Sequence, residues 1–429
     1  MTSAPSLPRG LVPNENIATV PLFDRTGWKR VRFGDVVENC AETCDPEEVG
    51  LERFVAMEHL EPGSLHVRSW GSVADGTTFT RRCRPGQVLF GKRRAYQRKV
   101  AVAEFEAVVS GDIYVLAPKD TQRLLPELLP FLCLSERFFQ HAVGTSAGSL
   151  SPRTNWSSLA SFEFDLPPLD QQRRIAEILW AADEVTERQR ALLDSIRVHS
   201  EALVYERMGQ QNHLAESLAE RREYEGNGWI IATGQSLLDK GILAALKDGN
   251  HGEQYPRSSE FSKVGTPYVA ASNVSDDGKI DFEGCPKLPD EIKKRLRIPP
   301  ARGGDVLLTH NATVGRVAII PDSQHEVVAS TTTTYYRANP SKLSNQYLAT
   351  YLRTSVFQSQ LHRVMKQSTR DQVPITAQKK LLFVIPPLEF QNEFVEEISG
   401  IERSIAAATH HLASCQQLSQ ELSNSVTNS

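Results

Sequence analysis

The sequence of 429 residues lacks the features of membrane-spanning and secreted proteins. No apolar run approaches the ~18 residues that a membrane-spanning helix needs, and the amino-terminal stretch lacks the basic-then-apolar pattern of a signal peptide. The six cysteines, at positions 40, 44, 83, 133, 285 and 415, are scattered, so the paired spacings of a disulfide framework or a four-ligand zinc site are missing. We therefore expect a reduced, cytoplasmic protein with no membrane contact.

Motifs of catalysis are also missing. The sequence contains no GxxxxGK[ST] phosphate loop, no GxGxxG after a strand and no GxSxG nucleophile motif. An amino-methyltransferase would need an Asx/Ser-Pro-Pro-aromatic motif, whereas both Pro-Pro pairs here are followed by leucine. Asp281 with Glu291 and Lys293 matches a nuclease pattern only loosely, and the histidines lack metal-ligand spacing. The sequence thus predicts a chain that is not an enzyme and binds no metal or cofactor by itself.

The net charge of −4, from 48 basic and 52 acidic residues, conceals a segregation of charge along the chain. Residues 226–389 carry 20 basic and 15 acidic side chains, whereas residues 170–225 carry 8 and 12 and residues 390–429 carry 1 and 5. Residues 1–169 are nearly balanced, with 19 and 20. Such an asymmetry indicates different partners for different parts of the chain.

An internal repeat organises the sequence. The segment 164–179, FDLPPLDQQRRIAEIL, aligns with 383–398, FVIPPLEFQNEFVEEI, at a shift of 219, which pairs Gln172 with Gln391. Further matches follow in the same order, from Gly-Trp at 27–28 and 228–229 to Phe-Gln at 139–140 and 357–358. The chain therefore consists of two copies of one unit, each a mixed domain followed by a helix.

Short β-type runs at 87–90, 113–116, 305–309 and 317–320 predict strands in these domains, and each Pro-Pro pair is expected to end a strand and start a helix. Two apolar series with alternating steps of four and three indicate a coiled-coil seam, in which the two helices pack on each other. A single helix on its own domain is the alternative. The seam positions in the two helices are Ile175, Leu179, Ala182, Leu193 and Ile196, with Phe394, Ile398, Ile401, Ile405 and Leu412.

The predicted fold class is α+β. It comprises an extension over 1–26, a first domain over 27–168, a helical region over 169–226, a second domain over 227–387 and a carboxy-terminal helix over 388–429. Residues 209–228 link the first helix to the second domain, and we expect them to continue helically to about Tyr224.

A basic cluster is the main candidate site of the first domain. The stretch 81–99 contains eight lysines and arginines and no acid, so it could neutralise phosphates or read guanine with arginine side chains. A solvated charged face is the alternative. The candidate DNA-binding residues here are Arg81, Arg82, Arg84, Lys92, Arg93, Arg94, Tyr96, Arg98 and Lys99, with Arg153 in the small polar loop 144–153.

The second domain has a more polar candidate site at the matching strand end. Amide, hydroxyl and guanidinium groups are suited to reading base edges, although a generic loop would also contain them. The candidates are Thr309, His310, Asn311 and Arg316, the preceding Lys294 and Arg295, and Lys366 and Arg370 in the loop 366–370.

This arrangement of two β-rich domains, each running into PPL-acid-x-Q and a long helix, resembles the specificity subunit of type I restriction–modification systems. The resemblance extends from about Gly27 to Leu422, although the second junction departs from the first by having Phe390 before Gln391. It implies two target recognition domains that each read one half of a bipartite, asymmetric site in double-stranded DNA, and two helices that pair antiparallel.

The resemblance also implies partners for a prokaryotic, non-catalytic DNA reader. Two modification subunits would dock on the helices and supply adenine methylation from S-adenosylmethionine. Restriction subunits would add translocation and cleavage with ATP and Mg. Two alternatives are a protein-binding scaffold and the recognition part of a related fused restriction enzyme.

Overall fold

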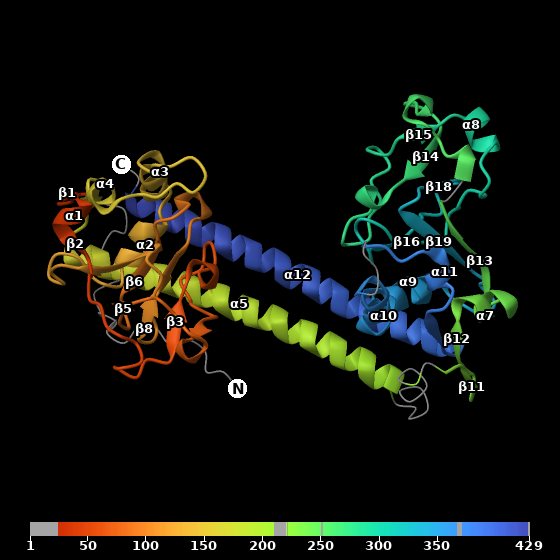
Figure 1. Cartoon of the computed structure of the whole chain (residues 1–429), viewed down its shortest axis with the longest axis horizontal. Coiled ribbons are helices and arrows are strands. Elements are labelled where there is room, and N and C mark those ends of the chain that lie inside the picture. Colours follow the sequence, from red (N-terminus) through yellow and green to blue (C-terminus); the bar gives the residue numbers. More distant parts are fainter. Residues whose placement is uncertain (1–24, 210–219, 221, 250–251, 367–370, 428–429) are drawn as a thin grey trace. The chain divides into compact units, whose positions relative to one another are not determined.

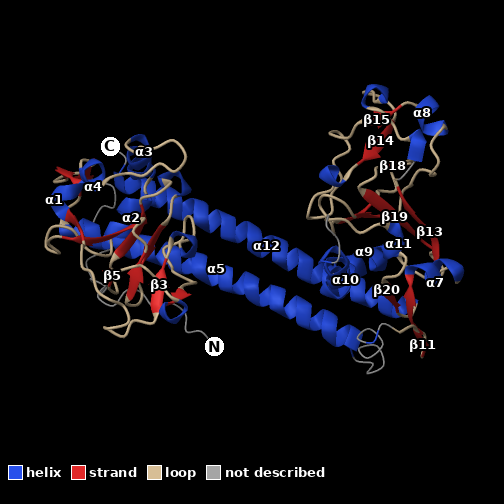
Figure 2. Cartoon of the chain, in the orientation of Figure 1, coloured by secondary structure: helices blue, strands red, loops and turns tan. Residues whose placement is uncertain are grey.

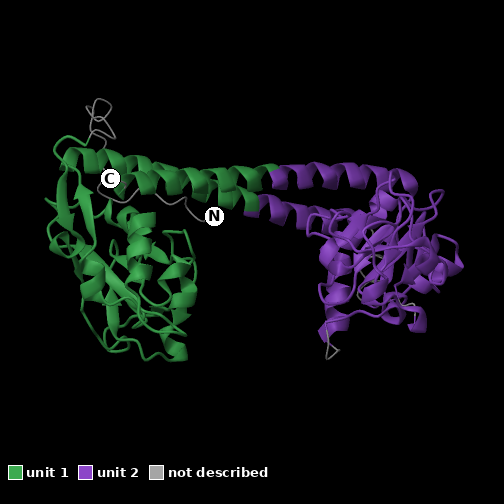
Figure 3. Ribbon diagram, turned by 90° about the horizontal axis from the view of Figure 1, so that it is seen from above, with its two compact units in different colours: residues 1–193, 407–429 green, residues 194–406 purple. Residues whose placement is uncertain are grey.

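The computed structural model describes residues 25–209, 220, 222–249, 252–366 and 371–427. The chain divides into two compact units, residues 1–193 with 407–429 and residues 194–406 (Figure 3). Each unit contains one mixed domain and one end of each long helix, α5 (Leu169–Gly209) and α12 (Leu388–Thr427) (Figure 1). The two units are described separately below.

The domain of the first unit is built on two four-stranded sheets. Their strand orders are β2-β9-β6-β7 and β4-β3-β8-β5, and β3 and β8 are the parallel pair. Figure 2 draws the strands in red among the helices and loops. The elements are β1 (Lys29–Arg32), α1 (Phe33–Val36), β2 (Val37–Asn39), β3 (Arg53–Val55), β4 (Gly71–Ser72), β5 (Arg81–Cys83), β6 (Val88–Gly91), β7 (Val100–Val102), β8 (Ala107–Val109), β9 (Ile113–Pro118), α2 (Leu129–Leu134), α3 (Glu136–Gly144), α4 (Trp156–Ala160) and β10 (Glu163–Leu166).

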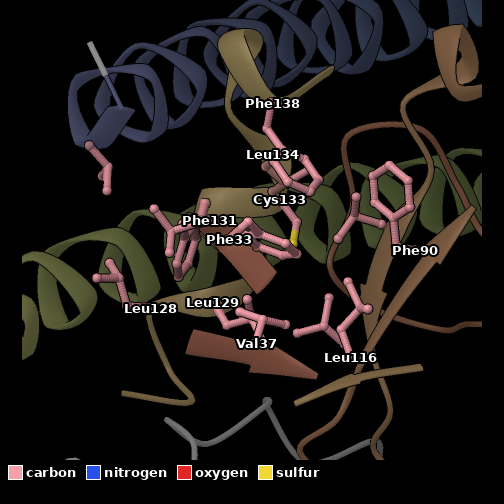
Figure 4. Close-up of a cluster of buried hydrophobic side chains, with 14 of the residues drawn as sticks. Phe33, Val37, Phe90, Leu116, Leu128, Leu129, Phe131, Cys133, Leu134 and Phe138 are labelled. Carbon is pink, nitrogen blue, oxygen red and sulfur yellow. The ribbon is translucent and has the colours of Figure 1, made fainter. Parts of the chain in front are cut away.

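Aromatic side chains dominate the core between the sheet and the short helices of this domain. Phe90 of β6 stacks on Phe139 at 5.8 Å between ring centroids and meets the edge of Phe138 at 5.4 Å. Phe33 of α1 packs on the same Phe138, and Figure 4 shows these rings beside the aliphatic side chains of α2. Burial of this cluster fixes the sheet whose hairpin carries the candidate site.

The domain of the second unit repeats this architecture. Its sheets have the orders β13-β19-β16-β17 and β15-β14-β18, with β14 and β18 as the parallel pair. The elements are β11 (Tyr224–Gly226), β12 (Trp229–Thr233), α7 (Gly234–Asp239), β13 (Leu243–Asp248), β14 (Thr266–Val269), β15 (Lys287–Leu288), α8 (Asp290–Lys294), β16 (Val306–Thr309), β17 (Val317–Ile319), β18 (Val328–Ala329), β19 (Thr333–Ala338), α9 (Asn345–Arg353), α10 (Ser355–Lys366), α11 (Ile375–Gln378) and β20 (Leu382–Ile385).

The predicted tandem repeat is therefore confirmed element by element, from β2 with β13 through β6 with β16 to β9 with β19. The strand predictions at β6, β9, β16 and β17 are confirmed to within two residues at each end. The Pro-Pro pairs end β10 and β20 and precede α5 and α12, as their fixed φ and missing N–H group favour.

A buried glutamine joins each domain to its long helix. The Gln172 amide donates to Arg123 O and Pro167 O and accepts from Leu125 N–H. Gln391 makes the equivalent three bonds, to the Lys342 and Pro386 carbonyls and from the Ser344 N–H. Both side chains are at most 1% exposed, and all of their partners are backbone atoms. The repeated PPL-acid-x-Q pattern is thus a structural latch.

The repeated Gly-Trp pair belongs to the same junction. Gly27 and Gly228 have φ of +83° and +78°, a region that favours glycine, and an added Cβ would lie 3.5 Å and 3.0 Å from the second proline of each Pro-Pro pair. Trp28 Nε1 donates to Gln171 Oε1, and the equivalent Trp229 packs on Phe390. The substitution of glutamine by phenylalanine at the second junction therefore exchanges a hydrogen bond for an aromatic contact.

Ion pairs hold the first domain against α5. His66 lies between Asp183 of the helix, at 2.8 Å, and Glu104, at 2.7 Å. Arg68 pairs with Glu187 of the helix at 2.5 Å. Burial disfavours the charged form of His66, but the hydrogen bonds that the ring donates to Asp183 and Glu104 outweigh it and raise its pKa to about 9. The histidine is therefore a cation at neutral pH.

The two long helices run antiparallel, which is visible within each unit. In the first unit, Leu422 and Val426 near the end of α12 share a cluster with Ile175 and Leu179 near the start of α5. In the second unit, the end of α5 meets the start of α12, where Arg207 Nε donates to Glu397 Oε2 at 2.8 Å. This arrangement confirms the expected antiparallel helix pair.

The expected helical continuation to Tyr224 is wrong at its end. Residues 224–226 form strand β11, which extends the β12-β20 ladder and so satisfies its backbone groups in the sheet. The 1–24 part of the predicted extension and residues 210–219 of the linker lie outside the described residues. All six cysteines are free. Within the described part of the chain, no helix combines the length and apolarity needed to cross a membrane.

Candidate nucleic-acid interface

Equivalent hairpin loops carry the candidate residues in the two domains. In the first, β6 and β7 enclose residues 92–99; in the second, β16 and β17 enclose residues 310–316. The Lys92 and His310 N–H groups both donate to the residue before the neighbouring strand, Asp112 O and Thr332 O, at 2.9 Å. The correspondence of the loops therefore extends to individual residues.

A second loop pairs with each hairpin at the same place. In the first domain an antiparallel bridge joins Arg93 to Arg153, and in the second a bridge joins Asn311 to Gln372. The first bridge brings the loop 144–153 onto the hairpin of the first domain. The second bridge brings Gln372, which follows the undescribed residues 367–370, onto the hairpin of the second domain. Each candidate site is thus made by two loops that the sheet core supports.

Asp112 organises the charged site of the first domain. Arg153 Nε donates to Asp112 Oδ1 at 2.8 Å, and Arg93 Nη1 donates to Oδ2 at 3.3 Å. Arg93 Nε also donates to Ser151 Oγ at 2.7 Å. Burial alone would raise the pKa of Asp112, but the two arginines outweigh it and lower the pKa below its ordinary value. Two half-exposed guanidinium groups are thereby held on one carboxylate.

The neighbouring side chains of this hairpin differ in exposure. Tyr96 is 56% exposed at its tip, where it is available for stacking. Arg94 adopts a left-handed backbone conformation with φ of 53°, and its buried Nε has no hydrogen-bond partner among the described residues. The Lys92 ammonium lies 4.8 Å from the centre of the Tyr114 ring, and burial lowers its pKa, opposed by Asp112. Lys92 is therefore more enclosed than its neighbours.

The remaining cations of the stretch 81–99 have internal partners. Arg82 and Arg84 both contact Glu42 and Glu106, at distances from 2.5 to 3.4 Å, and Arg81 donates to Asn39 and Cys40. Arg98 pairs with Glu136, and Lys99 donates to Met57 O. These carboxylates lie outside the stretch in sequence, so counting charges within it overstated its free positive charge. A role of these five residues in DNA binding stays a prediction.

The candidate residues of the second hairpin are only partly accessible. Thr309 is fully buried, and its Oγ1 accepts from Arg316 N–H at 2.9 Å. His310 is 5% exposed and neither ring nitrogen has a partner among the described residues; burial lowers its pKa, so the ring is neutral. Arg316 Nε donates to Asp276 Oδ1 at 2.6 Å. Asn311 and Arg316 are both half-buried, and Asn311 lies beside Gln372.

Three further candidates belong to other elements of the second domain, and a fourth lies outside the described residues. Lys294 is exposed at the end of α8, and Arg295 beside it pairs with Glu260 at 2.5 Å. Lys366 is exposed at the end of α10. Arg370 lies outside the described residues. Their assignment to DNA stays a prediction.

The predicted seam residues of both helices are buried or half-buried. Ile175, Leu179, Leu193, Phe394 and Ile398 are at most 6% exposed. The half-buried positions are Ala182, Ile196, Ile401, Ile405 and Leu412. Four apolar side chains of α5 are exposed, by contrast: Val185 and Leu192 in the first unit and Val198 and Tyr205 in the second, with one heptad between the members of each pair.

Sequence reasoning missed the residues that complete these sites. Asp112 lies outside the basic stretch in sequence and no local motif marks it, whereas Ser151 falls within the polar loop 144–153 but carried no signal of its own. Gln372 could have been found, because the repeat shift of 219 applied to Arg153 leads to it. Among the described residues, no group of three or more histidines, cysteines or carboxylates could hold a metal ion.

The chain matches a family profile described as the type I restriction modification DNA specificity domain, over residues 26–197 and 248–414. Each match contains one hairpin loop and its partner loop. Because the matches together cover more than half of the chain, the chain belongs to this family. It is a specificity subunit of a type I restriction–modification system, and its function is the recognition of DNA sequence.

Individual relatives agree with this assignment. The chain is 20% identical over 408 residues to the type I restriction enzyme MjaVIII specificity subunit of Methanocaldococcus jannaschii, covering 88% of this chain and 87% of that one. It is 25% identical over 186 residues to the EcoDI specificity subunit of Escherichia coli, covering 40% and 38%.

A solved type I S subunit from M. genitalium has the same fold, with a TM-score of 0.55, 12% identity and coverage of 94% and 96%. A chain from a structural study of type I R-M complex assembly and conformational transition gives 0.56, 20% identity and coverage of 93% and 97%. Because the matched family is a DNA specificity domain, DNA recognition is favoured over the alternative of a protein-binding scaffold.

Proposed function

We propose that each domain reads one half of a bipartite, asymmetric site in double-stranded DNA through its hairpin loop and the loop bridged to it. The observation that carries this proposal is the equivalence of the two loop pairs, which share backbone hydrogen bonds but present different side chains. Arg93 and Arg153 are charged, whereas Asn311 and Gln372 are amides. A repeated frame with different reading groups is suited to two unlike half-sites.

The long helices would dock the partner subunits. Two modification subunits would supply adenine methylation from S-adenosylmethionine, and restriction subunits would supply cleavage with ATP and Mg, all in the prokaryotic cytoplasm. Exposed apolar side chains on α5 support a docking role, because Val185 and Leu192 lie one heptad apart on one exposed face of the helix, and Val198 and Tyr205 lie one heptad apart on another.

The decisive experiment selects random duplex DNA with the full chain in complex with its modification subunits. We expect a split site with two defined halves. Arg93→Ala should relax one half and Asn311→Ala the other, because each substitution removes a group from one loop pair. A single continuous site, or a variant that relaxes both halves equally, would contradict the proposal.

A methylation assay tests the division of labour. The purified chain alone should transfer no methyl group from S-adenosylmethionine to DNA, whereas addition of the modification subunits should produce methyladenine at the selected site. Methylation by the chain alone, or a modification complex equally active and specific without it, would show that the roles are assigned wrongly.

A further inference from the structure

The two recognition loops differ at one equivalent position in a way that points to particular bases. Arg153 in the first domain and Gln372 in the second occupy the same bridge position, one residue before the N–H that donates to the first hairpin residue. We infer, resting on the proposed function above, that Arg153 reads a guanine in one half-site and Gln372 an adenine in the other.

The first assignment follows from how Arg153 is held. Its Nε is bonded to Asp112, while its terminal amino groups have no hydrogen bond within the described residues, and the side chain is 53% exposed. Asp112 is only 18% exposed, so the carboxylate is a fixed anchor rather than a competing ligand in solvent. A guanidinium anchored on one edge presents two parallel donors on the other, and guanine offers the matching O6 and N7 acceptors in the major groove.

Arg93 is less suited to the same task. Its Nε is bonded to Ser151 and its Nη1 to Asp112, which leaves one terminal amino group. It holds Asp112 in position and can present one donor to a base, but it lacks a free bidentate edge. Arg153 is therefore the specificity-determining arginine of the pair.

The second domain lacks the anchor that an arginine would use. Thr332 occupies the place of Asp112, and its Oγ1 accepts from Ala271 N–H at 2.8 Å, turned into the fold. The Gln372 side chain is half-buried and has no hydrogen bond among the described residues. A side-chain amide offers one donor and one acceptor together, which matches N7 and the N6 amino group of adenine.

The test measures base preference in each half-site separately. The full chain with its modification subunits is used to select random duplexes, and single-base variants of the selected site are then ranked by competition. Arg153→Gln should lower discrimination for one guanine roughly 5- to 150-fold, the equivalent of one good bidentate contact, and leave the other half-site unchanged. Gln372→Ala should do the same for one adenine.

A control variant, a transplanted pair and an unfolding measurement separate base reading from the effects of charge and folding. Arg123→Gln removes an equal charge from an exposed position of the same unit and should leave the preference at every base unchanged. The pair Thr332→Asp with Gln372→Arg transplants the anchored arginine into the second domain, and should convert its adenine preference towards guanine. Thermal unfolding of each variant verifies that the loops remain folded.

The outcomes distinguish this inference from the proposed function. A specific wild-type complex whose Arg153→Gln variant keeps its guanine preference overturns the inference alone, and so does a uniform loss of affinity across all sequences, which would indicate a phosphate contact. A wild-type complex that selects no bipartite site overturns the proposed function and, with it, this inference.

Discussion

Replacing His66 by glutamine should remove a pH-dependent part of the stability of the first unit. His66 is 14% exposed and bonded to Asp183 and Glu104, and its pKa rises from 6.5 to about 9 on folding. A group whose pKa is raised in the folded state contributes its full stabilisation below the unfolded pKa and loses it as pH rises through the folded pKa. The contribution should therefore be complete below pH ~6.5 and absent above pH ~9.

The magnitude follows from the size of the shift. A change of this size corresponds to about 3 kcal/mol, and solvent screening of the half-exposed Glu104 reduces it to about 2–3 kcal/mol. Urea unfolding followed by tryptophan fluorescence, at pH 6 and pH 9.5, measures the difference between wild type and His66→Gln. Comparing the two proteins at each pH cancels the contribution of every other titrating group.

His199→Gln is the matched control, because His199 is exposed on the same helix. We expect this variant to follow the wild type at both pH values. If the gap between wild type and His66→Gln is the same at pH 6 and pH 9.5, the reasoning about His66 is refuted, because the pairing would then contribute nothing through its charge.

Three further predictions concern the latch, the helix face and the hairpin. Gln391→Glu should lower the free energy of unfolding by about 3–5 kcal/mol, because it places a carboxylate against two carbonyl oxygens in a buried site. Thermal unfolding measures the loss, and Asn392→Asp at the neighbouring exposed position is the control. Val185→Glu with Leu192→Glu should abolish binding of the modification subunits in size-exclusion chromatography while leaving the melting temperature unchanged, and a retained complex would contradict docking at this face. Arg93→Glu with Arg94→Glu should weaken DNA binding by several kcal/mol in anisotropy titrations, counting ~1–3 kcal/mol for each contact, without loss of partner assembly; unchanged affinity at physiological salt would identify the hairpin as a merely solvated face.

Much of the architecture could be predicted because its determinants are local or periodic. Proline geometry marks the junctions at 167–168 and 386–387, and β-branched runs mark β6 and β16. The internal repeat strengthens each prediction, because a strand or junction found in one copy can be sought about 219 residues away in the other. The seam positions follow from spacing. Thr186 stands at the position four residues after Ala182, where the spacing calls for an apolar side chain; it is 7% exposed and its hydroxyl donates to Ala182 O, so the polar residue is tolerated.

The charges of the candidate site could not be predicted in the same way. The partners of Arg82 and Arg84 are Glu42 and Glu106, which the sheet brings together from 40 residues upstream and more than 20 downstream. Asp112 reaches the hairpin only because β9 pairs with β6. Long-range pairing decides these contacts, so a linear count of charges cannot reveal which cations are free.

The glutamine latches carry a consequence for how such a chain can evolve. Gln172 and Gln391 hold their domains through carbonyl and N–H groups of the main chain, and these groups are present whatever side chains the domain carries. Residues of the hairpins can therefore be exchanged, or a whole domain replaced by a distant relative, without loss of its attachment to the helix. Under the proposed division of roles, a new target sequence would thus be acquired in a single recombination event, while the long helices stay the same.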